Sequence, residues 1–423
     1  MQWIRFCSRE FGRAGALGVG IALLASLSPR IAAAQVAEAD VRTGVFIEPS
    51  AKSHMRVITP SLAVSATPVD FLTVNAGYAA DVVSGASESV KAGSSFADRP
   101  DIVSAASVTD LRQVATGGVT LHRGHTDLGA AYSYGTENDY KSNEITATAG
   151  TDFFQRNTKL EFAFGHGFDK VCDLADNGVQ APTARAPLDA SKGCFTSDVK
   201  RRSLDVSSDN FQGAWTQSLT PVLAVQLVLT GSVQRGFLSN PYRSVVIGPS
   251  GESAQEHHPD NRARGAAALR VKYFIRALDA SVGGGFRAYR DTWDIVSQTY
   301  ELEVEKSLTS FLRLQIRGRY YRQTAAIFWS DDYTGGEPAH GPRGQYFSGD
   351  REVSPLKSLL GGARVTASFH GRPGARIGHL FMDLDTSLGV NFLKTYLDDF
   401  TWAGTKPDDT LAMVFTGNVT ATF

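Results

Sequence analysis

Long apolar segments are missing from most of this 423-residue chain. Beyond residues 1–34, no stretch approaches the roughly 18 consecutive apolar residues that a membrane-spanning helix requires. Helical periodicity is nearly absent, whereas aromatic residues occur throughout and there are 41 glycines. The sequence therefore excludes a helical membrane protein and favours an all-β fold.

Cysteine and an excess of charge of either sign are also scarce. The chain has three cysteines, and its 42 basic and 43 acidic residues leave a formal net charge of -1. A balance this close to neutral gives no indication of nucleic-acid binding.

The first 34 residues have the pattern of a secretory signal peptide. Three arginines precede an apolar segment from Ala14 to Leu27, and the three alanines at 32–34 supply an A-x-A cleavage site. The apolar segment is shorter than the ~20 residues of a spanning helix, which disfavours the alternative of an N-terminal membrane anchor. We expect cleavage before Gln35 and a mature domain of residues 35–423.

Residues 300–321 show a clear strand pattern. Apolar residues alternate with glutamates in the first half and with arginines in the second, and successive side chains of a strand face opposite sides. A hairpin with its turn near Thr309 would place Glu305 opposite Arg313 and Glu301 opposite Arg317. The polar face should then carry a carboxylate row beside a guanidinium row, made of Glu301, Glu303, Glu305, Arg313, Arg317 and Arg319.

Similar alternation recurs along the chain in segments of about ten residues, the length of a tilted membrane strand. A soluble sandwich, which is the alternative, would need a second sheet over the apolar faces, and no segment is left to supply it. The pattern therefore predicts an all-β, transmembrane antiparallel β-barrel, with apolar side chains toward lipid and polar ones toward the lumen. Further charged residues on the predicted lumen face are Arg270, Arg287, Asp383 and Asp385.

Short and long connections alternate along the chain, as in bacterial outer-membrane barrels with tight periplasmic turns and longer external loops. With a first strand at 41–49, the pattern predicts sixteen strands. Fourteen is the alternative, because the segments at 41–49 and 111–121 are the weakest. The predicted short turns lie near Thr67–Asp70, His122–Thr126, Phe154–Asn157, Leu219–Pro221, Ile275–Leu278, Ser307–Ser310 and Arg372–Gly378. The predicted external connections lie at 83–110, 136–142, 168–207, 237–260, 292–296, 330–351 and 395–408.

The predicted external loop at 168–207 contains Cys172 and Cys194. In an exported protein such a pair predicts a disulfide, which would staple the loop. A metal site is the alternative, but two cysteines without a nearby histidine are fewer ligands than such a site requires.

Catalytic motifs are absent from the sequence. It contains no G-x-S-x-G, no H-E-x-x-H and no glycine-rich phosphate loop. The histidine pairs His122/His125 and His257/His258 lie in a predicted turn and a predicted loop, with too few ligands to predict a metal site. We therefore predict no catalytic residues, no metal and no cofactor.

The charged rows at 301–319 have two compatible interpretations: ion pairs that stabilise the barrel wall, or a field that selects solutes along a pore. A barrel of sixteen strands is wide enough for an aqueous channel. The leading hypothesis is a pore or gated channel for small hydrophilic solutes. The alternative is a non-conducting scaffold that anchors or presents envelope partners. A third hypothesis, an outer-membrane hydrolase, lacks a nucleophile and base that can be named.

The sequence ends in LAMVFTGNVTATF, which alternates up to Phe423. This ending resembles the signal that the outer-membrane insertion machinery reads on its clients, and Phe423 would also suit an aromatic girdle at the membrane surface. The residues predicted to face lipid are Leu411, Met413, Phe415, Val419, Ala421 and Phe423.

Several segments resemble, in order, the family called domain of unknown function 3570. They are RVITPSL, YAADVVSGAS, TENDYKS, DFFQRNTKLEF, FRAYRDTWDIVSQTYELE and RYYRQTAAIFW. The resemblance implies an outer-membrane β-barrel of unestablished role, with a periplasmic or lipoprotein partner, and it supplies no catalytic residues. Positions to inspect for shared contacts are Asp81, Ser84, Gly85, Asp139, Tyr140, Arg290 and Asp291.

Overall fold

The structure is a computed structural model. It describes residues 36–49, 54–84, 110–137, 139–172, 203–240, 244–247, 252–330, 346–370, 382–397 and 409–423. The predicted signal peptide lies outside these ranges. Within them, no helix has both the length and the apolar character needed to cross a membrane.

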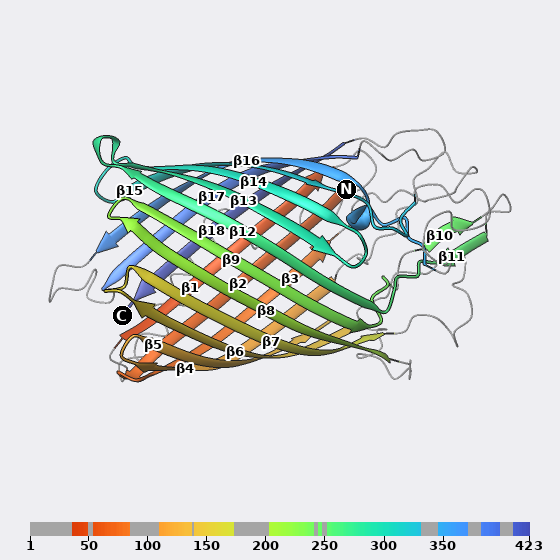
Figure 1. The fold of residues 1–423 in the computed structure, drawn as a ribbon, viewed down its shortest axis with the longest axis horizontal. Helices are drawn as coiled ribbons and strands as arrows, with labels where there is room; N and C mark the ends of the chain where they lie inside the picture. Colours follow the sequence, from red (N-terminus) through yellow and green to blue (C-terminus); the bar gives the residue numbers. More distant parts are fainter. Residues whose placement is uncertain are drawn as a thin grey trace, which may run out of the picture.

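Sixteen strands form a closed antiparallel barrel, and a separate two-stranded hairpin lies beyond one of its ends (Figure 1). The predicted number of strands is confirmed, including the two weakest, which become β1 and β4. The hairpin strands are β10 (Ser244–Ile247) and β11 (Glu252–Gln255). The barrel strands are β1 (Val36–Pro49), β2 (His54–Val69), β3 (Leu72–Ser84), β4 (Asp110–Arg123), β5 (Thr126–Thr136), β6 (Tyr140–Phe153), β7 (Thr158–Cys172), β8 (Ser203–Thr220), β9 (Leu223–Gly236), β12 (Asn261–Ile275), β13 (Ala280–Asp291), β14 (Val296–Ser307), β15 (Leu312–Gln323), β16 (Leu356–His370), β17 (Asp383–Tyr396) and β18 (Thr410–Thr422).

The short connections gather at one end of the barrel, which we call the turn end, and the long ones at the other, the loop end (Figure 1). Six predicted short turns lie between strands as expected, whereas the predicted turn at 372–378 lies outside the described residues. The loop predicted at 168–207 is shorter than predicted, because β7 continues to Cys172 and β8 already begins at Ser203. The ladder of β7 and β8 continues until Cys172 lies opposite Ser203, because backbone pairing extends past the last strongly alternating residues.

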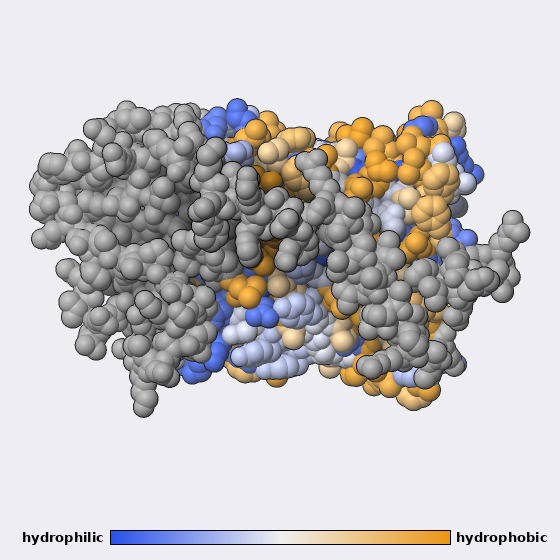
Figure 2. All heavy atoms as spheres, turned by 180° about the vertical axis from the view of Figure 1, so that it is seen from behind, coloured by the Kyte–Doolittle hydropathy of each residue, from blue (hydrophilic) through white to orange (hydrophobic). Residues whose placement is uncertain are grey.

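Side chains alternate between the two faces of the wall, and the outward face is apolar. Leu302 on β14 and Leu388 on β17 are each 59% exposed on that face. Glu303, which follows Leu302 in the chain, points inward to an ion pair with Lys272. Figure 2 shows orange, hydrophobic residues over much of the visible barrel surface, with paler and blue, more hydrophilic residues among them. The chain is therefore an outer-membrane β-barrel whose outer surface contacts lipid.

Aromatic side chains occur at two levels of the outward face. Toward the loop end, Phe286, Tyr300 and Tyr320 lie directly opposite one another on β13, β14 and β15, with ring centroids 5.1 and 6.3 Å apart. At the turn end, Phe311 and Phe369 stack at 5.9 Å. Two such levels are typical of the aromatic girdles that mark the two membrane surfaces.

The barrel closes where β1 pairs with β18. Phe423 donates its backbone N–H to the Ala37 carbonyl at 2.8 Å, and its ring packs in a buried cluster with alanines and Val419. On the other face of the same seam, Thr420 donates to Asp40 at 2.7 Å. The last strand therefore satisfies the free edge of the first strand, which lipid cannot do.

The face assignment predicts opposite outcomes for two adjacent positions on β17. Leu388→Arg would place a guanidinium in lipid about half-way along the strand, at a cost of roughly 2 to 4 kcal/mol. Ser387→Arg is the matched control, because its side chain enters the lumen. We expect the first variant alone to lower the fraction of heat-modifiable, folded barrel in membranes. Equal losses in both variants would contradict the assignment.

Candidate functional site: a charged wall inside the barrel

The charged rows of β14 and β15 lie on the lumen face, as predicted, but their register differs from the prediction. Glu301 lies opposite Arg319 and Glu303 opposite Arg317. The predicted pairing was wrong because the turn lies one residue later than predicted. It comprises residues 308–311, and the backbone N–H groups of Leu308 and Thr309 both donate to the Leu312 carbonyl. A turn centred one residue later moves every pair by two positions.

Ion pairs nevertheless connect the rows. Glu305 contacts Arg313 diagonally at 3.7 Å, which preserves the predicted partners without the predicted register. Lys272, on β12, lies 3.6 Å from Glu303 and 4.0 Å from Glu305. Gln315 donates to Glu303 at 3.2 Å. The carboxylate row therefore receives cations and donors from both sides.

Two glycines allow these contacts to span an intervening strand. Gly283 on β13 lies between Lys272 and Glu303, and a Cβ there would come within 2.7 Å of Glu303 Cγ. Gly362 on β16 has the same role, because Asn391 lies over it and accepts a hydrogen bond from Arg317 Nε at 2.9 Å. Sequence reasoning missed these contacts. The available signal was a glycine on the polar face between two charged strands.

Arg270 and Arg287 face a recess on the neighbouring part of the lumen wall. Its volume is about 550 Å³, and its lining also includes Asp127, Lys159 and Glu161. The last two form an ion pair at 2.7 Å. Arginines and carboxylates from β5 to β13 therefore line one recess.

Asp383 and Asp385 lie on the lumen face near the turn end. The carboxylate oxygen Oδ1 of Asp383 lies 2.9 Å from Nδ1 of His370. Asp385 is opposite Ser368, to which Arg313 donates at 3.1 Å. The structure thus places Asp385 beside the charged wall and Asp383 at its margin.

The described lumen face is electrically asymmetric. On β12 to β16, basic side chains outnumber acidic ones, whereas on β1 to β7 the reverse holds. The basic side chains of the first group are Arg262, Arg264, Arg270, Lys272, Arg287, Arg313, Arg317, Arg319 and Arg364, against Asp291, Glu301, Glu303 and Glu305. The acidic side chains of the second are Glu38, Asp40, Glu48, Asp81, Asp127, Glu144, Asp152, Glu161 and Asp169, against Arg42, Arg112 and Lys159.

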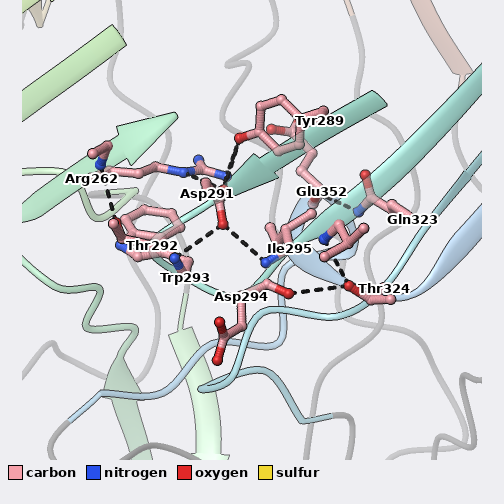
Figure 3. A network of polar contacts seen from close by, with 12 residues as sticks. Arg262, Tyr289, Asp291, Thr292, Trp293, Asp294, Ile295, Gln323, Thr324 and Glu352 are labelled. Atoms are coloured by element: carbon pink, nitrogen blue, oxygen red, sulfur yellow. Dashed lines mark hydrogen bonds and ion pairs between the residues drawn. The ribbon is translucent and has the colours of Figure 1, made fainter. Parts of the chain in front are cut away.

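At the loop end, the buried carboxylate of Asp291 organises the connection between β13 and β14 (Figure 3). One oxygen accepts from Arg262 at 2.5 and 2.9 Å and from the Tyr289 hydroxyl at 2.8 Å. The other accepts the backbone N–H groups of Trp293 and Ile295 at 3.0 and 2.9 Å. Five donors on one carboxylate fix the path of this connection.

The Trp293 ring extends this network into an apolar cluster. The guanidinium of Arg262 lies 4.0 Å from the ring centroid, and the indole N–H donates to the Asn261 carbonyl at 3.0 Å. Trp293 packs with Phe328, Val353 and other residues from three connections. The loop end therefore has a small core of its own.

The remaining family-motif positions do not converge on one site. Asp81 lies opposite Arg112 on β4, and Tyr140 donates to Asp169 at 2.5 Å. Asp139 is buried, and its carbonyl accepts from Cys172. Arg290 points outward and lies 3.7 Å from Asp294, although it precedes the inward Asp291. Ser84 is the last residue of β3, and Gly85 lies outside the described residues.

Cys172 is disulfide-bonded and fully buried at the end of β7. Cys194 lies outside the described residues, so its pairing with Cys172 stays a prediction.

Glu256, His258 and Ser348 form a buried polar junction that sequence reasoning did not find. Ser348 donates to Glu256 Oε2 at 2.8 Å, and His258 Nε2 lies 3.4 Å from Glu256 Oε1. The serine therefore points to the carboxylate and not to the imidazole that would have to remove its proton in a catalytic triad. Its side chain is also inaccessible. The arrangement joins two external connections.

We expect Asp291→Asn to loosen the loop end, because the neutral amide would leave Arg262 with a weaker partner and replace an acceptor by a donor. Asp294→Asn is the matched control, since Asp294 is 58% exposed. Hydrogen exchange should accelerate at residues 292–295 in the first variant alone. Unchanged exchange in Asp291→Asn would contradict this role.

Comparison with known proteins gives one family match and several structural likenesses. The family model described as "Protein of unknown function (DUF3570)" matches residues 17–379. No curated protein matches the sequence. Among solved structures, a "Bacterial polysaccharide outer membrane secretin" has a TM-score of 0.47 at 10% identity, covering 92% of this chain and 98% of that one.

Two further similar structures are OpdQ from Pseudomonas aeruginosa and OccAB1 from Acinetobacter baumannii. OpdQ has a TM-score of 0.41 at 7% identity, covering 92% of this chain and 98% of its own. OccAB1 has a TM-score of 0.43 at 9% identity, covering 92% and 96%. At identities this low, none of these likenesses says what this chain transports or binds.

Proposed function

We propose that this chain, which belongs to the DUF3570 family, forms a pore or gated channel for small hydrophilic solutes across the outer membrane. The observation that carries the proposal is the asymmetric, solvent-accessible charge of the lumen face. Lys272 and Arg313 are 49% and 47% exposed inside the barrel despite their ion pairs. Charges that stay hydrated in this way can interact with a passing solute.

The ion pairs on the lumen face join strands that are close to one another in the wall, which also favours a pore. Those between Lys272, Glu303, Glu305 and Arg313 connect neighbouring or next-neighbouring strands along the wall. Contacts along a wall stabilise it without filling the space that it encloses. The alternative, a non-conducting scaffold that presents a periplasmic or lipoprotein partner, would require side chains or loops that close the lumen.

Planar-bilayer conductance of the purified full chain separates these two functions. We expect discrete ion-permeable openings for a pore. An absence of openings at every salt concentration and voltage, from protein shown to be folded by heat modifiability, would overturn the pore and favour the scaffold.

Removing arginines from the wall should change ion selectivity. Arg313→Ala and Arg317→Ala delete positive charge from the lumen face, so reversal potentials in asymmetric salt should shift toward cation selectivity. Arg290→Ala is the matched control, because that guanidinium points outward. A shift of equal size in the control would show that the wall does not line the ion path.

The proposal includes the route of the chain to the membrane. We infer that the signal peptide is removed before Gln35, that Cys172 and Cys194 pair after export, and that the insertion machinery reads the last strand through Phe423. The aromatic ring supports the last inference, because it lies at the β1–β18 seam that closes during insertion.

Deletion of Phe423 should therefore lower the amount of folded barrel in the outer membrane. Met413→Ala, on the same strand, is the control for a general loss of side-chain volume. Refolding of both purified variants into detergent separates recognition from stability. Normal assembly of the deletion variant in cells would contradict the recognition role.

A further inference from the structure

The recess in the lumen wall extends from β13 to β5, and one row of the sheet runs along it. Strand register places Arg287 at one end of this row and Asp127 at the other, with Glu161 two strands before Asp127. In order of strands from β13 to β5, the row is Arg287, Ala268, Val228, Ala214, Glu161, Gly150 and Asp127. All of these residues line the recess.

The middle of the row is uncharged and made of short side chains. Ala268, Val228 and Ala214 occupy the three strands between the charged ends, and their small size leaves the wall hollow. Two amides, Gln212 and Gln226, line the recess beside them. Within the described part of the chain, Gln226 donates to a threonine hydroxyl at 3.1 Å, and the Gln212 side chain has no hydrogen-bond partner. The floor therefore offers amide donors and acceptors between the two charged ends.

The cationic end of the recess has guanidinium groups without carboxylate partners. Arg287 lies 5.7 Å from the ring centroid of Tyr289, a contact that leaves its N–H donors free. Arg270 and Glu301 approach Gly285 from two sides, but among the described residues no carboxylate lies within ion-pair distance of either arginine. Two guanidinium groups with unused donors beside one recess suit the carboxylate of a solute.

Carboxylates lie close together at the other end. Glu161 leans over Gly150, where a Cβ would come within 3.9 Å of Glu161 Cγ, and Asp127 is opposite the same glycine. Lys159 contacts Glu161 at 2.7 Å, and His122 contacts Asp127 at 2.7 Å. The two carboxylate side chains nevertheless stay 42% and 55% exposed. This end can therefore accept the ammonium group of a solute.

We propose that the recess binds short zwitterionic peptides on their way through the pore. The peptide carboxylate would contact Arg270 and Arg287, its ammonium group would contact Glu161 and Asp127, and the two glutamines would hydrogen-bond its backbone. A solute with a single charge can use only one end of the recess. This inference rests on the proposed pore, because the pore brings solutes to the lumen wall, and it gives the pore a substrate class.

The length of the row sets the length of the peptide. Arg287 on β13 and Glu161 on β7 are separated by the strands β12, β9 and β8, which corresponds to about 19 Å along the wall at ~4.8 Å per strand. Inward side chains of a barrel converge, so the charged groups are closer together than the backbones. An extended chain covers at most ~3.5 Å per residue, so a peptide of about three to five residues spans roughly 10 to 17 Å. A single amino acid is too short to reach both ends.

The test is the binding of tetraglycine to the purified full chain in detergent micelles, measured by isothermal titration calorimetry. Tetraglycine amide lacks the carboxylate charge, and N-acetyltetraglycine lacks the ammonium charge. We expect each analogue to bind roughly tenfold more weakly, because each loses a hydrogen-bonded charge. Diglycine, which cannot reach both ends, should bind as weakly as the analogues.

Substitution of either end should remove discrimination against one analogue alone. Arg270→Gln with Arg287→Gln should bind tetraglycine and its amide equally, and should still bind the acetylated peptide more weakly. Glu161→Gln with Asp127→Asn should show the converse.

The matched control is Arg319→Gln with Arg364→Gln. It removes two lumen arginines that do not line the recess and should keep both differences between the peptides. Heat modifiability of every variant establishes that the barrel is folded.

The wild type alone can overturn the proposal. Equal binding of tetraglycine and both analogues would do so, as would equal binding of diglycine. A loss with the amide only would indicate a simple anion site and would also contradict it. Among the variants, an unchanged preference in Arg270→Gln with Arg287→Gln, or an equal loss in the control, would contradict the assigned residues.

Failure of this inference and failure of the pore are distinguishable, because binding in detergent requires no conduction. Bilayer openings without discrimination among the peptides would contradict the peptide site and leave the pore in place. Discrimination among the peptides without openings would contradict the pore and support the site.

Discussion

The backbone hydrogen bonds that join β1 to β18 are the constraint on which the rest of the structure depends. In hydrocarbon, an unpaired strand edge costs several kcal/mol per polar group, so a sheet in a membrane has to close. Closure gives the wall two faces that differ in solvent, and the alternation of side chains then assigns every residue of a strand to lipid or to the lumen. The charged wall is a consequence, because Glu303 and Arg317 could not face lipid.

Charge inside the barrel creates a packing problem that glycine solves. Long side chains on adjacent strands crowd one another, whereas Gly283 and Gly362 leave room for contacts that reach across a strand. Lys272 thereby meets Glu303, and Arg317 meets Asn391. These contacts hold Lys272 and Arg317 against the wall, and both side chains stay exposed inside the barrel.

The two ends of the barrel are stabilised differently. Tight turns suffice at the turn end, where most connections are a few residues long. At the loop end, Asp291 and the Trp293 cluster fasten connections that come from distant parts of the sequence. Two adjacent residues at the loop end have different surroundings. Arg290 points outward and is exposed, whereas Asp291 is buried in the network that fixes the connection between β13 and β14.

Alternation with a period of two was sufficient to determine the fold class, the lumen face and the position of most turns, because burial in lipid leaves the sequence little freedom at each outward position. It favoured sixteen strands over fourteen, and the closed barrel decided between them. It did not determine register, since a turn centred one residue later moves each pair without moving any residue to the other face. Register decided that Glu303 lies opposite Arg317. It also placed Arg287 and Glu161 in one row of the sheet, although they are far apart in the chain. The contacts over Gly283 and the contact of Arg262 with Asp291 likewise required the tertiary structure, because they join strands whose distance in space no local pattern records.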